Sequence, residues 1–437
     1  MRSDDTIFAP ASGFGRAAVC VVRISGPKSR FIIETIAGPV PSARRLALRT
    51  LRDPETGDAL DQALVAWMPG PGSFTGEDQV ELHVHGGLAS RAAVLRTLGD
   101  LPDCRAAEAG EFTRRAFLNG RMDLSRVEGL ADLIDAETEA QRRQALLQLE
   151  GRLGNAAEGW REDVLQALAM LEASLDFSDE GDVPEALEEE ILRRLRILAT
   201  AIGETLANRS GERLREGLMV VLAGAPNAGK STLLNALAQR DVAIVSPIAG
   251  TTRDAIEVRC DLGGLPVIIV DTAGLRESTD VIEREGVARA EARARQADIV
   301  LWLIPPEDGV IEPPPGRLVL RVGTKSDLNR TRHDCDLVVS AATGAGIPEL
   351  IDRLQIEAGK LLGGGSDALV TRERHRLALE SAKDCLTKAI EMLERRGPVE
   401  LAAEEVRLAA RALGRVAGRV DVDDVLDRLF ASFCIGK

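Results

Sequence analysis

The most constraining feature of this sequence is a glycine-rich loop between an apolar run and a helical segment. Residues 224–231 read GAPNAGKS and fit the pattern G-x-x-x-x-G-K-[ST]. They follow the apolar run LMVVL at 218–222 and precede TLLNAL at 232–237. The pattern predicts a buried strand, a turn whose backbone N–H groups surround phosphate oxygens, and a helix that begins at the same phosphates. We expect Lys230 to reach the outer phosphates and Ser231 to ligate Mg2+.

Three later motifs follow apolar runs and complete a guanine-nucleotide pattern. DTAG lies at 271–274, TKSD at 324–327 and SAA at 340–342. Asp271 is predicted to act on Mg2+, and Gly274 to offer a backbone N–H to a γ-phosphate. The Asp327 carboxylate can accept two N–H bonds from guanine that adenine cannot donate. The alternation of strands and helices predicts a mostly parallel, doubly wound sheet with its ligand at the strand C-termini.

Hydrolysis needs a group that the motifs do not supply. Leu275 follows DTAG, so the glutamine that orients the attacking water in many switch GTPases is missing. The candidate residues for hydrolysis are Asn227, the segment 246–250 before Thr251 and Thr252, and Glu283. Each has an ordinary alternative, because an Asn after Pro often serves turn chemistry and a Glu in a charged helical run is usually solvated.

The predicted GTP-binding set gathers these segments. Its members are Asn227, Ala228, Gly229, Lys230, Ser231, Thr232, Ser246, Pro247, Ile248, Ala249, Gly250, Thr251, Thr252, Asp271, Thr272, Ala273, Gly274, Thr324, Lys325, Ser326, Asp327, Ser340, Ala341 and Ala342.

The rest of the chain divides around this domain, and its 437 residues have room for about three domains. Residues 1–118 contain short apolar runs separated by Gly and Pro, which predict a mixed α+β domain. Residues 119–214 and 361–437 carry long amphipathic patterns, and SRVE at 125–128 reads as a capping box. We therefore predict a helical bundle into which an α/β P-loop GTPase domain, residues 215–360, is inserted.

Composition narrows the function classes. The net charge of −14 argues against a protein that coats nucleic acid non-specifically. The six cysteines lack metal-ligand spacing, so reduced thiols are expected, and His83 and His85 lack a third ligand nearby. No apolar stretch is long enough for a membrane span and the first five residues do not begin a signal peptide, so we expect a cytoplasmic protein without membrane contact.

Motifs outside the nucleotide domain carry a resemblance over essentially the whole chain. They are DTIFAP at 5–10, VVRISG at 21–26, SFTGEDQVELHVHGG at 73–87, GEFTRRAFLNGRMDLSRVEGLADLIDAETEAQ at 110–141 and FCIGK at 433–437. With the inserted nucleotide motifs, the chain resembles the MnmE (TrmE) family of bacterial tRNA modification GTPases. The N-terminal domain of that family is similar to folate-dependent aminomethyl carriers. With a flavoprotein partner, MnmG, the family places an aminomethyl or carboxymethylaminomethyl group on carbon 5 of the tRNA wobble uridine.

The resemblance also implies ligands and partners. A tetrahydrofolate derivative, in its 5-formyl or 5,10-methylene form, is expected beside Arg23, Glu81, Arg121 and Lys437. K+ is expected at Asn227, Ser246, Ile248 and Thr251, and Mg2+ at Ser231 and Thr252. Glu283 matches the water-positioning glutamate and is the predicted catalytic residue. A homodimer through the N-terminal domains, a heterotetramer with the flavoprotein and a tRNA substrate are implied, and no catalytic role is assigned to Cys434. If Lys437 borders the folate site, the chain end must fold back onto residues 1–118, and we expect it to do so across a dimer formed by the N-terminal domains.

One departure and one alternative remain. The family usually has asparagine where this chain has Thr324, and threonine cannot reproduce both hydrogen-bonding functions of that amide. The alternative function is a GTPase switch in ribosome assembly, since related nucleotide domains with Leu after DTAG serve that purpose. An assembly factor usually carries a compact basic RNA-binding domain, and the sequence shows none.

Overall fold

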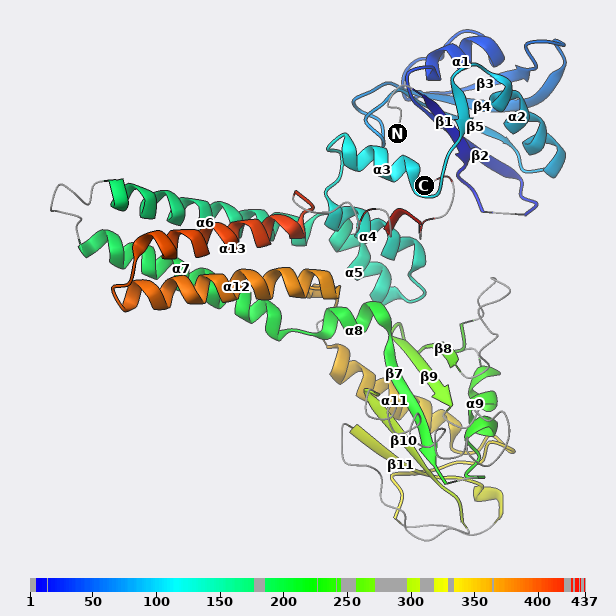
Figure 1. Cartoon of the computed structure of the whole chain (residues 1–437). Coiled ribbons are helices and arrows are strands. Elements are labelled where there is room, and N and C mark those ends of the chain that lie inside the picture. The colour runs from blue at the N-terminus through cyan, green and yellow to red at the C-terminus, as the bar shows by residue number, and fades with distance from the viewer. Residues whose placement is uncertain are drawn as a thin grey trace, which may run out of the picture. The chain divides into compact units, whose positions relative to one another are not determined.

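The computed structural model describes residues 5–13, 15–176, 185–225, 227–240, 242–244, 257–271, 297–306, 318–328, 334–363, 365–419, 426, 429–431, 433 and 436. The chain forms two compact units (Figure 1). The first unit comprises Met1–Ala131, Gly154–Glu158 and Leu413–Lys437, and the second comprises Asp132–Leu153 and Gly159–Ala412.

The first unit is built on a six-stranded sheet. Its strands are β1 (Thr6–Pro10), β2 (Val19–Ser25), β3 (Leu46–Arg52), β4 (Ala59–Met68), β5 (Gln79–His85) and β6 (Cys104–Ala106), in the spatial order β3-β4-β5-β2-β1-β6. β1 and β6 are parallel, and the other neighbours are antiparallel. The predicted mixed α+β fold is confirmed.

The two faces of this sheet have different roles. Helices α1 (Ser29–Ile36) and α2 (Leu88–Asp100) cover one face, where apolar side chains from strands and helices form a single buried core. That core includes Val22, Ile24, Ile33, Leu82 and Leu98. Because side chains alternate along a strand, Arg23 and Glu81 lie on the opposite face.

Helix α4 (Leu124–Asp135) begins with a different cap from the predicted one. The Asp123 carboxylate accepts from the backbone N–H of Arg126 at 2.9 Å and from the Ser125 hydroxyl at 2.6 Å. The predicted capping box at Ser125 is therefore wrong, because a carboxylate two residues earlier takes that role. A true capping box lies at Thr138 and Gln141, before α5 (Glu139–Leu149).

Long helices form the bundle. They are α6 (Arg152–Asp176), α7 (Glu185–Ala207), α12 (Glu373–Glu394) and α13 (Val399–Val416). Helix α7 packs along α12, and an ion pair at 2.8 Å joins Arg407 of α13 to Glu172 of α6 (Figure 1). Segments from both sides of the nucleotide domain thus make one bundle, as predicted. No helix among the described residues is long and apolar enough to cross a membrane.

The inserted domain has its own six-stranded sheet. Its strands are β7 (Leu218–Gly224), β8 (Glu257–Asp261), β9 (Pro266–Asp271), β10 (Ile299–Ile304), β11 (Leu318–Gly323) and β12 (Leu337–Val338), in the order β12-β11-β10-β7-β9-β8. Only β8 is antiparallel to its neighbour among these described strands. Helices α9 (Lys230–Ala238) and α11 (Ile347–Leu362) contribute to the main core of this sheet. The predicted, mostly parallel α/β domain is confirmed.

Candidate functional site

The phosphate loop connects β7 to α9 through unusual backbone conformations. Gly224 has φ +139°, and a Cβ there would collide with the carbonyl oxygen of Leu303 on β10. Gly229, the residue that caps α9, has φ +91°, and Asn227 has φ +62° although it is not glycine. Backbone turned in this way directs successive N–H groups toward one point, which suits an anion.

Polar side chains meet at the base of this loop. The Lys230 ammonium is buried and donates to the carbonyls of Gly224 and Ala225, both at 2.9 Å. The Ser231 hydroxyl donates a short hydrogen bond to the Asp271 carboxylate, which is buried at the end of β9. Hydroxyl and carboxylate oxygens are the ligands that Mg2+ prefers, so the pair fits the predicted ion. The described residues contain no group of three or more His, Cys, Asp or Glu side chains arranged for a metal.

A second pocket lies beside the phosphate loop. It is a cavity of about 200 Å³ whose lining includes Thr324, Asp327 and Ala341. The Asp327 carboxylate is held by the hydroxyl of buried Ser340 at 2.6 Å. The buried Thr324 hydroxyl donates at 2.8 Å to the carbonyl of Ala228, which belongs to the phosphate loop. Thr324 thereby ties the base pocket to the phosphate loop.

Several predicted residues lie outside the described part of the chain. They are Ser246, Pro247, Ile248, Ala249, Gly250, Thr251, Thr252, Thr272, Ala273, Gly274, Glu283 and Lys437, together with Leu275 and Cys434.

The face of the N-terminal sheet opposite α1 and α2 brings other predicted residues together. Arg23 on β2 and Glu81 on β5 are direct cross-strand neighbours, and the guanidinium donates to Oε1 of the carboxylate at 3.1 and 3.2 Å. The guanidinium carbon lies 5.3 Å from the ring centre of Phe74 and 5.8 Å from that of Phe112. Arg121 packs over Gly76, in the same segment as Phe74. This face therefore presents a carboxylate and a guanidinium beside two aromatic rings.

A network of charges fixes the surroundings of that face. Arg115 on helix α3 (Glu111–Leu118) pairs with Asp5 at 2.7 Å, Glu77 at 3.2 Å and Glu111 at 3.2 Å. Arg105 also pairs with Asp5 and Glu111. Burial alone would raise the pKa of the Glu111 carboxyl, but hydrogen bonds from Arg105, a backbone N–H and Arg115 outweigh it, and the pKa is lowered. The ionised network joins Asp5, the residue before β1, to α3 and to the segment around Phe74.

The end of the chain lies against the same domain. Gly436 is buried with φ +102°, and a Cβ there would collide with the carbonyl oxygen of Pro10 at the end of β1. Phe430 packs against Gly110, and the Arg114 guanidinium lies 5.9 Å from the centre of its ring. The expected return of the chain end to the N-terminal domain is confirmed for Gly436, within one chain.

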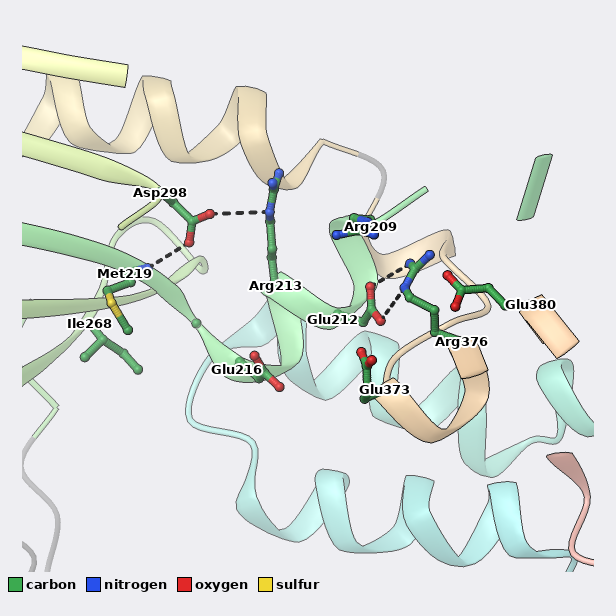
Figure 2. Close-up of a pocket in the computed structure, with 11 residues that line it drawn as sticks. Arg209, Glu212, Arg213, Glu216, Met219, Ile268, Asp298, Glu373, Arg376 and Glu380 are labelled. Atoms are coloured by element: carbon green, nitrogen blue, oxygen red, sulfur yellow. Dashed lines mark hydrogen bonds and ion pairs between the residues drawn. The ribbon is translucent and has the colours of Figure 1, made fainter. Parts of the chain in front are cut away.

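Sequence reasoning did not find the connection of the nucleotide sheet to α12. Figure 2 shows two ion pairs from consecutive residues of α8 (Ser210–Glu216), beside a cavity of about 600 Å³. Glu212 makes two hydrogen bonds with buried Arg376 of α12, at 2.8 and 2.7 Å. Arg213 pairs at 3.4 Å with Asp298, which also accepts from the backbone N–H of Met219 at 3.1 Å. Because these partners are far apart in the sequence, spacing gave no signal for them.

Comparisons with known proteins agree with this geometry. Residues 124–434 match the family described as MnmE helical domain, and residues 6–121 match GTP-binding protein TrmE N-terminus. The chain belongs to the MnmE family. A tRNA modification GTPase MnmE of Methylobacterium sp. (strain 4-46) is 63% identical, with 99% of this chain and 100% of that protein covered. For one of Azorhizobium caulinodans the identity is 53% and both coverages are 100%.

Among solved structures, the G domain of the T. maritima FeoB iron transporter aligns with 32% of this MnmE-family chain and 98% of that chain, at 22% identity and a TM-score of 0.23. A structural similarity this low supports no inference, so the assignment to the MnmE family is based on the sequence matches.

Proposed function

We propose that this MnmE-family chain hydrolyses GTP while it modifies the wobble uridine of tRNA. With an MnmG-type flavoprotein it adds an aminomethyl or carboxymethylaminomethyl group to carbon 5 and takes a one-carbon unit from a tetrahydrofolate derivative. The observation that carries the proposal is the presence, in one MnmE-family chain, of a guanine-nucleotide site and a separate sheet face with a carboxylate, a guanidinium and two aromatic rings.

The nucleotide roles follow from the contacts of the inserted domain. Lys230 and the backbone of its loop neutralise the phosphates, and Ser231 with Thr252 holds Mg2+. Asp327, fixed by Ser340, reads the guanine N–H groups. Asn227, Ser246, Ile248 and Thr251 would hold K+, which would supply positive charge at the transition state. Glu283 orients the attacking water.

The residues on the N-terminal sheet face fit a reduced folate. A carboxylate such as Glu81 accepts from the N–H groups of a pterin edge, and Phe74, which is partly exposed, offers apolar surface to a ring. Arg121 and Lys437 supply positive charge for the acidic tail of the ligand. The packing of Gly436 against Pro10 supports a place for Lys437 near this face, because β1 pairs with β2, the strand of Arg23.

The exposed edge of the same sheet supports a homodimer through the N-terminal domains. Leu46 and Leu48 on edge strand β3 are 56% and 65% exposed, and Leu64 on β4, the cross-strand partner of Leu48, is 40% exposed. Apolar side chains grouped on one face at an edge strand favour association with a second copy. We propose that this dimer binds the flavoprotein as a heterotetramer in the cytoplasm, where its tRNA substrate is made.

Ribosome assembly is the weaker alternative. It calls for a compact basic RNA-binding domain, whereas residues 6–121 match the TrmE N-terminal family and the whole chain has a net charge of −14.

Two variants of the purified protein test the two halves of the proposal. Arg23→Ala should weaken binding of 5-formyl-tetrahydrofolate, measured by calorimetry, without changing GTP turnover. Asp327→Asn should shift nucleotide preference from guanine toward xanthine, because an amide replaces the acceptor, without changing folate binding. Wild-type protein that binds no folate would contradict the proposed folate site. Unchanged guanine preference in Asp327→Asn would contradict the proposed guanine-nucleotide site.

A further inference from the structure

Three polar side chains follow one another on the side of β5 that faces away from α1 and α2. Gln79, Glu81 and His83 are spaced by two residues, so they project from the same side of the strand. Their cross-strand neighbours on β2 are Ser25, Arg23 and Val21, respectively. Since Arg23 contacts the rings of Phe74 and Phe112, this row lies on the face that we propose for the folate.

Two atoms of this row are buried without a hydrogen-bond partner in the described part of the chain. They are Oε1 of Gln79, a residue that is 1% exposed, and Nε2 of His83. Leaving such an atom unsatisfied costs on the order of 1–3 kcal/mol, and buried polar atoms are seldom left so. Two of them on one side of one strand indicate that a ligand supplies the missing hydrogen bonds.

The chemistry of the row defines that ligand. Arg23 occupies Oε1 of Glu81, and the other carboxylate oxygen, Oε2, lies 3.5 Å from Nε2 of His83. This separation permits an ion pair but is long for a hydrogen bond. When the His83 ring carries its proton on Nδ1, its Nε2 is an acceptor, and a separation of this size is expected between two acceptor atoms. Gln79 Oε1 and His83 Nε2 are then two acceptors without an N–H donor, and Glu81 Oε2 is a further acceptor in the same row. A reduced pterin ring carries several N–H donors on one planar edge, from its amino group and its ring nitrogens.

We propose that Gln79 and His83 are ligand-contacting residues of the folate site, and that the row Gln79, Glu81 and His83 reads the N–H edge of the reduced pterin. The inference rests on the proposed function and adds two residues to its folate site. Binding of the pterin satisfies both buried acceptors, so each of them contributes to affinity and to the choice of a pterin over other anionic ligands.

Apolar replacements of similar size test the proposal in the full-length protein. Gln79→Met and His83→Leu remove the acceptors, and each should weaken binding of 5-formyl-tetrahydrofolate by about 10-fold or more in calorimetry. His85→Gln is the matched control, since His85 is two residues further along β5, is 70% exposed and bonds to Asp61 at 2.7 Å. It should bind within twofold of wild type. A melting temperature no lower than that of wild type, with unchanged GTP turnover, shows that each variant is folded.

A second ligand separates this inference from the proposed function. 6-Methyltetrahydropterin has the pterin edge but no glutamate tail, so the losses in Gln79→Met and His83→Leu should recur with it. Folded variants that bind 5-formyl-tetrahydrofolate as tightly as wild type would overturn the roles of Gln79 and His83 and leave the folate site in place. Wild-type protein that binds neither ligand would overturn the folate site itself, and the inference with it.

Discussion

Replacing Thr324 by valine removes one hydroxyl and almost no volume. That hydroxyl donates at 2.8 Å to the Ala228 carbonyl in a buried contact between the base pocket and the phosphate loop. Without it the carbonyl loses its partner, which costs on the order of 1–3 kcal/mol. Because the two loops are then no longer held together before the nucleotide binds, we expect part of this loss to appear in nucleotide affinity. A share of about 1 kcal/mol corresponds to roughly fivefold weaker binding.

Thr324→Asn adds hydrogen-bonding groups where Thr324→Val removes one. An amide carries two N–H donors and an acceptor, so it can keep the bond to Ala228 and offer a further group to the nucleotide. We expect Thr324→Asn to bind GDP about 10-fold more tightly than wild type, which is about 1.4 kcal/mol. Thr324 makes the contact between the loops, and we expect it to make one contact fewer to the nucleotide than an asparagine would.

Equilibrium titration with a fluorescent GDP analogue measures both effects, and hydrogen exchange of the phosphate loop reports the contact itself. Thr387→Val, the same change at an exposed position of α12 outside the nucleotide domain, is the control and should bind within twofold of wild type. If Thr324→Val matched wild type in both affinity and loop protection, the structural tie between Thr324 and Ala228 would have no energetic role.

Three further predictions concern hydrolysis and the chain end. Turnover should be faster in K+ than in Na+ at matched ionic strength, because Leu275 cannot orient water and Asn227 offers an oxygen to a monovalent ion; equal rates would argue against the ion. Glu283→Ala should leave GTP affinity nearly intact and slow hydrolysis by roughly two orders of magnitude or more, and equal loss of binding and turnover would make Glu283 structural. Removal of residues 435–437 should abolish tRNA modification and weaken folate binding in calorimetry, while GTP hydrolysis survives. Undiminished folate binding would assign the tail to another step.

Local signals explain what the sequence could predict. The strand, loop and helix around Lys230 are contiguous, so their order alone indicated a phosphate site at the end of β7. The predicted capping box at Ser125 was wrong although it too is a local signal, because two possible capping residues lie two positions apart and the Asp123 carboxylate caps the helix.

Contacts between distant residues explain what the sequence could not predict. Arg23 and Glu81 are 58 positions apart, and their pairing depends on the register between β2 and β5; only the family resemblance placed them together. Arg376 and Glu212 are 164 positions apart, and neither lies in a motif. Their ion pair depends on where the folded chain places α8 and the first turn of α12, which periodicity does not encode.

The central claim is that this chain modifies the wobble uridine of tRNA. Mass spectrometry of tRNA nucleosides from a strain that lacks its gene tests the claim most directly. We predict loss of the aminomethyl and carboxymethylaminomethyl groups at carbon 5 of the wobble uridine, with recovery on expression of the wild-type chain and none with the variant lacking residues 435–437. A strain without the gene that retains these modified uridines at wild-type levels would contradict the account.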